Sequence, residues 1–436
     1  MSEWSERLRT RIAAREARTA VVGLGYVGLP LLAELARAGF RAIGIDTDQR
    51  KIASLQAGRS YVLDVPDAAI APAIGEGRIE VSGDFDLLRD ADTINICVPT
   101  PLRKSKDPDV SYILRARDAI KARMGPGKLV ILESTTYPGS TEELLLPELQ
   151  DGGLAVGEDF FLAFSPERVD PGNAVHTTRT IPKVVGGVTP TCTALASCLY
   201  EATVEQVVPV SSPRVAEMVK LLENTFRSVN IALANEMALL CDRMGLNVWE
   251  VIDAAATKPF GFMPFYPGPG LGGHCIPIDP FYLTWKARMT GFESRLVELA
   301  AQINASMPTY VVNLVRRALN EQRKPVAGSR ILLLGVAYKE NIDDLRESPA
   351  LDVLRLLEED GAEVEYHDPF VPAFTVGESE YRSVALSPER IGGYDLIVVT
   401  TAHREIDYAA LLAAAPAVVD TRNALGGTDD PKLYRL

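Results

Sequence analysis

One of the five cysteines stands where a thiol could do chemistry. Cys275 lies in the glycine- and proline-rich segment 267–280, in which backbone N–H groups could surround a thiolate. Asp279 follows four residues later and could act as a base or orient one. The other four cysteines lie in segments expected to be strands or helices, where a thiol usually belongs to the core. The residues alone leave open whether Cys275 is a nucleophile.

Two pairs of polar side chains could bind negative charge. Lys220 and Asn224 stand four positions apart on an expected helix, so they share one face and could stabilise a developing oxyanion. A solvated helix face is the alternative interpretation. Lys339 and Arg346, in the segment 336–348, could clamp a diphosphate. They could equally belong to a charged surface loop with internal ion pairs.

The sequence Gly-Leu-Gly-Tyr-Val-Gly, which begins at Gly23, follows a short apolar run and precedes an alanine-rich apolar stretch. This order predicts the strand, tight turn and helix of a dinucleotide-binding unit. Gly23 permits the turn, Gly25 lets the backbone approach a pyrophosphate, and Gly28 lets the helix pack against the strand. Tyr26 and Val27 lie in the same turn, where the N–H groups of the helix N-terminus could bind the phosphates.

An acidic residue completes this unit. A second apolar run, 41–45, ends in Asp46. Its carboxylate would accept hydrogen bonds from a ribose 2′-hydroxyl and repel a 2′-phosphate, which favours NAD over NADP. A glycine turn alone is weak evidence, but strand, turn, helix and acid in this order predict an NAD site.

The chain then continues as an α/β protein. Strand-like apolar runs occur at 93–98, 129–132 and 160–164. Helical patterns separate them, which predicts a doubly wound sheet. In such sheets the ligand lies beyond the carboxyl ends of the strands. Polar, proline-bearing segments follow the three runs at 99–101, 133–137 and 165–168, so we expect them to form the cleft.

The pattern changes from about residue 212. Apolar residues recur at helical spacing over 215–244 and 298–322, which predicts long helices that form either a subunit interface or an intramolecular spine. A second α/β unit begins at 329–335. It lacks a Gly-x-Gly-x-x-Gly turn, so we expect it to bind something other than a dinucleotide.

The composition excludes several classes of function. The chain has 436 residues, enough for two or three domains, and a formal charge of −13 without a basic run to track a nucleic acid. No apolar stretch reaches the roughly 18 residues of a membrane span, and the N-terminus lacks a signal-peptide core. The five cysteines include no Cys-x-x-Cys pair and the four histidines are widely spaced, so we expect no metal site. The cysteine usage also predicts a protein of the reducing cytoplasm.

Together these motifs resemble the UDP-glucose/GDP-mannose dehydrogenases, which oxidise the C6 alcohol of a nucleotide sugar to a carboxylate. The matching segments span nearly the whole chain: 23–30, 98–101, 133–135, 165–167, 220–227, 272–275 with Asp279, and 335–339 with 344–346. The resemblance implies two Rossmann-like domains joined by a central helical region, and a homodimer. The expected parts are an N-terminal helix (1–18), an NAD-binding domain (19–211), a central dimerisation region with the cysteine loop (212–325) and a UDP-binding domain (326–436).

The resemblance also implies roles for single residues. Cys275 would be the nucleophile, and Lys220 and Asn224 would stabilise oxyanions. Asp279 would assist proton transfer, while Glu167 and Thr135 would position the water or the substrate hydroxyl. Cofactor contacts are expected, besides the glycine turn and Asp46, at Thr100, Glu133 and Arg346. Substrate contacts are expected at Arg168, Lys220, Phe265, Tyr266, Gly272 and Lys339.

Several residues resemble the 2-acetamido-sugar branch of this family more than the UDP-glucose branch. His274 precedes the cysteine, Arg168 follows Pro-Glu, and Ile278 replaces the usual lysine before Asp279. The segment 257–267 resembles that of UDP-N-acetylglucosamine 6-dehydrogenases. Its aromatic side chains would line the sugar site, or else only pack the loop.

We therefore expect an NAD-dependent oxidation of UDP-N-acetyl-D-glucosamine for a surface polysaccharide or O-antigen. The N-acetylmannosamine epimer is the nearest alternative, and UDP-glucose and the galactosamine epimer stay open. A catalytically idle nucleotide-sugar binding protein on the same fold is a further alternative, because a fold alone does not prove activity.

Overall fold

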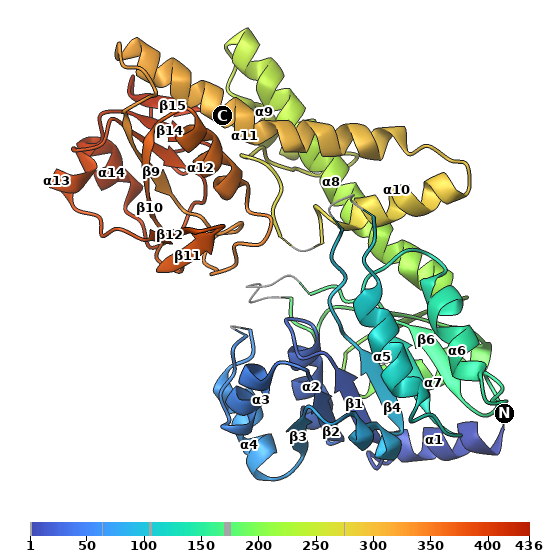
Figure 1. The fold of residues 1–436 in the computed structure, drawn as a ribbon. Helices are drawn as coiled ribbons and strands as arrows, with labels where there is room; N and C mark the ends of the chain where they lie inside the picture. The colour runs from blue at the N-terminus through green and yellow to red at the C-terminus, as the bar shows by residue number, and fades with distance from the viewer. Residues whose placement is uncertain (1, 63, 104–106, 170–175, 274) are drawn as a thin grey trace. The chain divides into compact units, whose positions relative to one another are not determined.

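The computed structural model describes residues 2–62, 64–103, 107–169, 176–273 and 275–436. The chain forms two compact units (Figure 1). The first unit comprises Met1–Glu223 and Phe281–Gly291, and the second comprises Asn224–Pro280 and Phe292–Leu436. The part of the predicted cysteine loop at His274 lies outside the described residues. No helix in the described part of the chain is long and apolar enough to cross a membrane.

The first unit is built on an eight-stranded sheet. Its strands are β1 (Arg18–Val22), β2 (Arg41–Ile45), β3 (Ile79–Ser82), β4 (Thr93–Ile96), β5 (Leu129–Leu132), β6 (Phe161–Phe164), β7 (Lys183–Gly187) and β8 (Val207–Val210). Their order is β3-β2-β1-β4-β5-β6-β7-β8. Neighbours run parallel except β6 and β7, which are antiparallel. Valine, isoleucine and leucine fill the central strands, as expected for a sheet buried on both faces.

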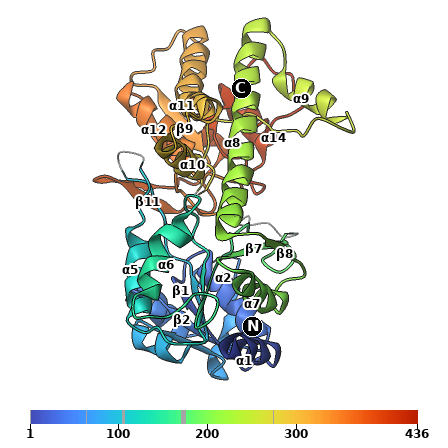
Figure 2. The same ribbon diagram turned by 90° about the vertical axis from the view of Figure 1, so that its right-hand side faces the viewer.

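Helices cover both faces of this sheet. They are α1 (Glu3–Ala13), α2 (Gly28–Arg37), α3 (Gln49–Gln56), α4 (Asp67–Gly75), η1 (Phe85–Asp90), α5 (Ser111–Lys121), the π-helix η2 (Thr141–Leu145), α6 (Leu146–Gln150) and α7 (Pro190–Glu201). Side chains of α1, α2 and α7 share one core with the sheet, and those of α5 and α6 share the other. The predicted N-terminal helix packs beside α7 through Leu8 and Ile12 (Figure 2).

A long helix, α8 (Pro213–Met244), runs from the first unit into the second. The second unit adds α9 (Val248–Ala256), the start of α10 (Asp279–Met289), α11 (Arg295–Glu321), α12 (Pro349–Glu359), α13 (Pro388–Ile391) and α14 (Tyr408–Ala414). Its strands are β9 (Arg330–Leu334), β10 (Glu363–His367), β11 (Ala373–Val376), β12 (Ser379–Arg382), β13 (Leu396–Val399), β14 (Val418–Asp420) and β15 (Leu433–Arg435). The order β10-β9-β13-β14-β15 is parallel throughout, while β11 and β12 form a separate hairpin. The predicted α/β class with two Rossmann-like parts and a helical region is confirmed.

The first strand of the first unit ends in a turn that an aspartate holds. Gly23 has φ +94°, a conformation that favours glycine, and its N–H donates to the carbonyl of Ile45 at 2.8 Å. The next N–H, of Leu24, donates to Asp46 Oδ2 at 2.9 Å. The acid after β2 therefore fixes the turn after β1.

The second unit repeats this arrangement with one difference. Gly335 has φ +85°, and its N–H donates to the carbonyl of His367 at 2.8 Å. The N–H of Val336 donates to Asp368 Oδ2, also at 2.8 Å. However, Nε2 of the buried His403 lies 3.0 Å from the same oxygen. Burial raises the pKa of Asp368, but the hydrogen bond and charge of His403 outweigh it, so the pKa is lowered. His403 thus takes the hydrogen-bonding position on Asp368 that a ribose hydroxyl could otherwise use.

Candidate active site

The glycine turn after β1 leaves room for a phosphate group. A Cβ atom on Gly25 would meet no described atom within 4 Å. A Cβ atom on Gly28 would instead lie 1.8 Å from the carbonyl oxygen of Gly23. Helix α2 begins at Gly28 without a side-chain hydrogen bond to its first N–H groups, and Tyr26 beside it is 36% exposed. The turn is therefore open where an anion could approach the helix N-terminus.

Asp46 lies at the edge of this turn. Its Oδ2 accepts the N–H of Leu24, and its Oδ1 accepts the N–H of Asp48 at 2.9 Å. Lys51 Nζ is 3.4 Å from Oδ2. Such an acceptor next to a glycine turn fits the ribose of a dinucleotide.

The loop after β5 is clamped to α8 by one buried glutamate. Glu217 accepts hydrogen bonds from the N–H groups of Gly139 at 2.5 Å and Thr141 at 2.9 Å, and from the hydroxyl groups of Ser140 and Thr141. Burial outweighs these hydrogen bonds, so the pKa of Glu217 is raised. This loop carries Thr135, which is half-buried.

The next turns of α8 hold the loop after β6. Lys220 Nζ donates to the backbone carbonyl of Glu167. Three residues on, Glu223 pairs with Arg168 at 2.6 Å, and Arg168 also donates to the carbonyl of Pro182 at 2.6 Å. Lys220 is only 7% exposed, so the alternative of a solvated helix face is wrong for it. The contacts of Arg168 are internal, and its predicted role toward substrate stays a prediction.

Behind this loop lies a buried polar cluster. The Glu133 carboxylate accepts hydrogen bonds from Asn95 Nδ2 at 2.8 Å and from the Tyr200 hydroxyl at 2.5 Å. Lys183 Nζ lies 2.6 Å from its other oxygen. All four residues are buried. These partners occupy both carboxylate oxygens of Glu133, and the cofactor contact that the resemblance implies for this residue stays a prediction.

Glu167 is a carboxylate of the same region that is held by backbone N–H groups and lies near a cation. Its Oε1 accepts the N–H groups of Arg168 and Val169, both at 2.7 Å. Its Oε2 lies 3.5 Å from Lys183 Nζ. Burial raises the pKa of Glu167, but Lys183, the two N–H groups and Lys220 outweigh it, so the pKa is lowered. Glu167 is therefore ionised at neutral pH.

Thr100 follows β4 at the same edge of the sheet. Its backbone carbonyl accepts the Tyr282 hydroxyl at 3.1 Å. The first unit thus brings together the glycine turn, Asp46 and the segments after β4, β5 and β6, as the predicted sheet requires.

In the second unit, Cys275 begins a tight turn into α10. Its carbonyl accepts the N–H groups of Ile278 at 3.0 Å and Asp279 at 2.7 Å. The thiol is half-buried and is not part of a disulfide. Asp279 is buried, and its Oδ2 accepts a hydrogen bond from Asn224 Nδ2. Because Asn224 is only 5% exposed, the solvated-face alternative is wrong for it too.

Glycines let the cysteine loop pack on the loop after β9. A Cβ atom on Gly272 would lie 2.4 Å from Cβ of Tyr338. The N–H of Gly273 donates to the carbonyl of Arg346 at 3.0 Å. Arg346 pairs with Asp344 at 2.5 Å, and Lys339 in the same loop is half-buried. The predicted nucleophile and the predicted diphosphate ligands thus lie on two loops in contact.

The aromatic residues before this loop do not share one environment. Phe265 packs edge-on against Phe226 with 5.7 Å between ring centroids. Tyr266 stacks on Trp249. Phe260 is 72% exposed, so simple packing of the loop explains Phe265 but not Phe260.

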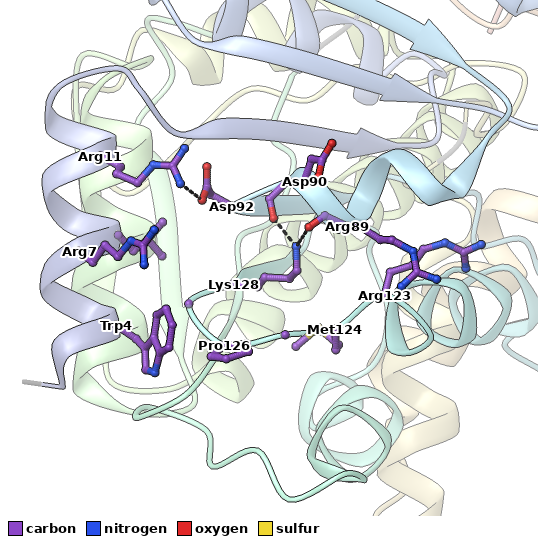
Figure 3. A pocket seen from close by; sticks show the side chains of 14 residues that line it. Trp4, Arg7, Arg11, Arg89, Asp90, Asp92, Arg123, Met124, Pro126 and Lys128 are labelled. Atoms are coloured by element: carbon purple, nitrogen blue, oxygen red, sulfur yellow. Dashed lines mark hydrogen bonds and ion pairs between the residues drawn. The ribbon is translucent and has the colours of Figure 1, made fainter.

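A separate hollow of about 370 Å³ is lined by Arg7, Arg11, Arg89 and Arg123, and Figure 3 shows the pairing of Arg11 with Asp92 at its wall. Lys128 Nζ donates to three carbonyls at the end of η1, those of Leu88, Arg89 and Ala91, at 2.6–2.9 Å. Arg11 of α1 pairs with Asp92 at 2.8 Å. These cations cap η1 and attach α1, so we assign the hollow no ligand.

Sequence reasoning missed four buried polar residues. They are Asn95, Lys183, Tyr200 and Glu217. Two of them carried a signal, since Asn95 interrupts an apolar strand and Lys183 begins one. No group of His, Cys, Asp and Glu side chains in the described residues could hold a metal.

Three family models match the chain. They are the NAD-binding, central and UDP-binding domains of the UDP-glucose/GDP-mannose dehydrogenase family, at residues 17–204, 214–306 and 332–427. The open glycine turn and Asp46 fit the NAD that the first of these domains binds.

Characterised relatives cover nearly all of the chain. A UDP-N-acetyl-D-glucosamine 6-dehydrogenase of Pseudomonas aeruginosa is 40% identical over 395 residues, 90% of this chain and 92% of the relative. A UDP-N-acetyl-D-mannosamine dehydrogenase of Pyrococcus horikoshii is 38% identical over 89% of this chain and 90% of the relative. The solved structure of a UDP-D-ManNAc dehydrogenase from Pyrococcus horikoshii matches with a TM-score of 0.88 and 34% identity, covering 96% of this chain and 98% of that one.

The glycine turn yields a paired prediction. Gly25→Ala places its methyl in the open space, so we expect the unfolding free energy to stay within about 0.5 kcal/mol of the unchanged protein. The Kd for NAD should rise at least about tenfold, or ~1.4 kcal/mol. Gly28→Ala, the matched control, should destabilise the first unit by about 1–3 kcal/mol because its methyl collides with Gly23. Calorimetric NAD titration and thermal unfolding measure both. Unchanged NAD affinity in Gly25→Ala would contradict the assignment.

Proposed function

Because the chain belongs to the UDP-glucose/GDP-mannose dehydrogenase family and is an NAD-dependent nucleotide-sugar dehydrogenase, we propose that it oxidises UDP-N-acetyl-D-glucosamine at C6 to the uronate. The observation that carries the substrate is the 40% identity with a UDP-N-acetyl-D-glucosamine 6-dehydrogenase over 90% of the chain. The Arg168 and 257–267 features of the sequence support the same branch.

The proposed reaction removes four electrons. NAD, which the glycine turn and Asp46 would hold, would supply the hydride acceptor for the two oxidations. Cys275 adds as a thiolate to the aldehyde from the first oxidation and gives a thiohemiacetal, which the second oxidation converts to a thioester. Water then releases the uronate and the free thiolate. The thiol of Cys275 is half-buried and forms no disulfide, which suits this role.

Neighbouring residues would support each step. Lys220 and Asn224 would stabilise the oxyanions, and their burial supports this because a donor acts more strongly away from water. Asp279, hydrogen-bonded by Asn224, would assist proton transfer. Glu167 would accept a hydrogen bond from the hydrolytic water together with Thr135.

The first prediction of this proposal concerns stoichiometry. Complete oxidation of one UDP-sugar should give two NADH, measured by absorbance against uronate formed. Cys275→Ser should stop turnover before uronate release, because an oxygen ester would not form and hydrolyse as readily at neutral pH. One NADH per sugar would instead indicate a two-electron dehydrogenase, and full activity of Cys275→Ser would refute the covalent step. Binding of NAD and UDP-sugars without any NADH formation would point to an idle binding protein.

The second prediction concerns the sugar. The manno and galacto epimers differ from the glucosamine substrate at one carbon each, and relatives named for both chemistries match the chain. One or two contacts must then discriminate, and a lost buried polar contact costs about 1–3 kcal/mol. We expect kcat/KM for UDP-N-acetyl-D-glucosamine to exceed that for either epimer and for UDP-glucose by roughly 5- to 150-fold. NADH assays with the four sugars side by side decide this, and a preference for another sugar would overturn the assignment.

The third prediction concerns assembly. Large apolar side chains lie exposed along α8 at helical spacing: Leu222, Phe226, Leu233, Leu240 and Met244. We propose that they form the interface of a homodimer. Light scattering should give twice the chain mass of 47.3 kDa. Leu233→Glu should shift the equilibrium toward monomer, whereas Val376→Glu, an equally exposed position on β11, should not. A monomer at working concentration in the unchanged protein would contradict the proposal.

The setting of the enzyme is also a proposal. The five cysteines form no disulfide, which suits a reducing cytoplasm. A uronate made there would supply a surface polysaccharide or O-antigen.

A further inference from the structure

The buried cluster of the first unit joins three strands and a helix. Asn95 comes from β4, Glu133 follows β5, Lys183 begins β7, and Tyr200 belongs to α7. The Tyr200 ring also faces the Lys183 ammonium, with 5.1 Å from Nζ to the ring centroid. Glu133 and Lys183 thus neutralise each other in a site with almost no exposed surface.

Lys183 has a second carboxylate within reach. Its Nζ lies 2.6 Å from Glu133 and 3.5 Å from Glu167 Oε2. Two backbone N–H groups already fix the other oxygen of Glu167. Among the described residues, Lys183 is thus the cation that forms an ion pair with Oε2, the oxygen of Glu167 that these N–H groups do not bind.

The antiparallel course of β7 makes this contact possible. The carboxyl ends of β4, β5 and β6 meet at one edge of the sheet. Because β7 runs against β6, its first residue lies at that same edge. A lysine at the start of a parallel strand would lie at the opposite edge, away from Glu167.

We propose that Lys183 is a positioning residue for hydrolysis of the acyl-enzyme: held by Glu133 and Tyr200, it keeps Glu167 as a carboxylate with Oε2 oriented toward the attacking water. This inference rests on the proposed function, which supplies the thioester on Cys275. In the hydrolysis the water oxygen bonds to the acyl carbon, and Glu167 takes one proton. The C–S bond breaks, and Cys275 leaves as a thiolate.

The inference predicts that hydrolysis suffers more than hydride transfer when Lys183 loses its charge. Without the ammonium, Glu167 is less firmly oriented, and a small misplacement of a catalytic group can cost about 100-fold in rate. The two hydride-transfer steps do not depend on Glu167 in this proposal, so their catalytic residues are unchanged. An acyl-enzyme should then accumulate.

The test compares Lys183→Met, Lys183→Arg and Glu167→Gln with the unchanged enzyme. Each is mixed with NAD and UDP-N-acetyl-D-glucosamine, quenched in acid and weighed intact by mass spectrometry, while NADH is followed by stopped flow. In Lys183→Met and Glu167→Gln we expect a fast burst of two NADH per site, about 100-fold slower steady turnover and a covalent adduct on Cys275. Lys183→Arg, which keeps the charge, should restore most of the turnover. Lys121→Met is the control and should behave as unchanged enzyme, because this half-buried lysine of α5 pairs with Glu148 and Asp151 and has no proposed catalytic role.

The outcomes separate the two proposals. An adduct in Glu167→Gln but none in Lys183→Met, with a lost burst or weakened NAD binding, would overturn the role of Lys183. No Cys275 adduct in any variant would overturn the proposed covalent function itself. If Lys183→Met does not fold because Glu133 is left unpaired, Lys183→Met/Glu133→Gln removes both charges and should still accumulate the adduct. Normal hydrolysis in that double variant would also refute the inference.

Discussion

A carboxylate can be buried only with a counter-charge or with several hydrogen-bond donors, and the first unit depends on this constraint at the edge of its sheet. Glu133 satisfies it with Lys183, Tyr200 and Asn95. Removing one partner of such a pair typically costs about 3–5 kcal/mol, since the other charge stays buried. The cluster of Asn95, Glu133, Lys183 and Tyr200 therefore connects β4, β5, β7 and α7 where the parallel strands end. The loops that carry Thr135 and Glu167 start from that fixed edge.

The two α/β units share one hydrogen-bonded turn, but its surroundings differ. In each, the acid after the second strand accepts the N–H that follows a left-handed glycine. In the first unit the acid Asp46 accepts backbone N–H groups and lies near Lys51, so it is a polar acceptor beside an open turn. In the second unit His403 fills the same position beside Asp368 and also accepts the N–H of Asn341 at 3.0 Å. The buried His403 thus links Asp368, which holds the glycine turn, to Asn341 in the loop that carries Lys339.

Local patterns predicted the fold and the glycine turn because their causes are local. A glycine with positive φ, a helix packed through Gly28 and an acid after an apolar run all leave marks within about thirty residues. The family motifs also predicted the class of enzyme, an NAD-dependent nucleotide-sugar dehydrogenase, because each motif holds its residues at a short spacing. The predicted functional residues therefore appear on the expected elements of both units.

Contacts between distant segments could not be read in this way. Glu217 reaches a loop 76 residues away, and Lys183 pairs with a residue 50 positions earlier. The solvated-face alternative for Lys220 and Asn224 was wrong because burial depends on what packs against a helix, not on the helix itself. The pairing of Arg168 with Glu223 could not be predicted either, because the two residues are distant in the sequence.

Three glutamates at this edge show how surroundings assign different work to one residue type. Glu217 accepts hydrogen bonds from four neutral donors, and burial raises its pKa. Its oxygens are all committed to holding a loop. Glu133 is committed likewise, to a lysine, a tyrosine and an asparagine. Glu167 differs on both counts, because nearby cations and N–H groups lower its pKa, and its Oε2 forms a 3.5 Å ion pair with Lys183. An ionised carboxylate is well suited to accept a hydrogen bond from a water molecule, so these surroundings agree with the role proposed for Glu167.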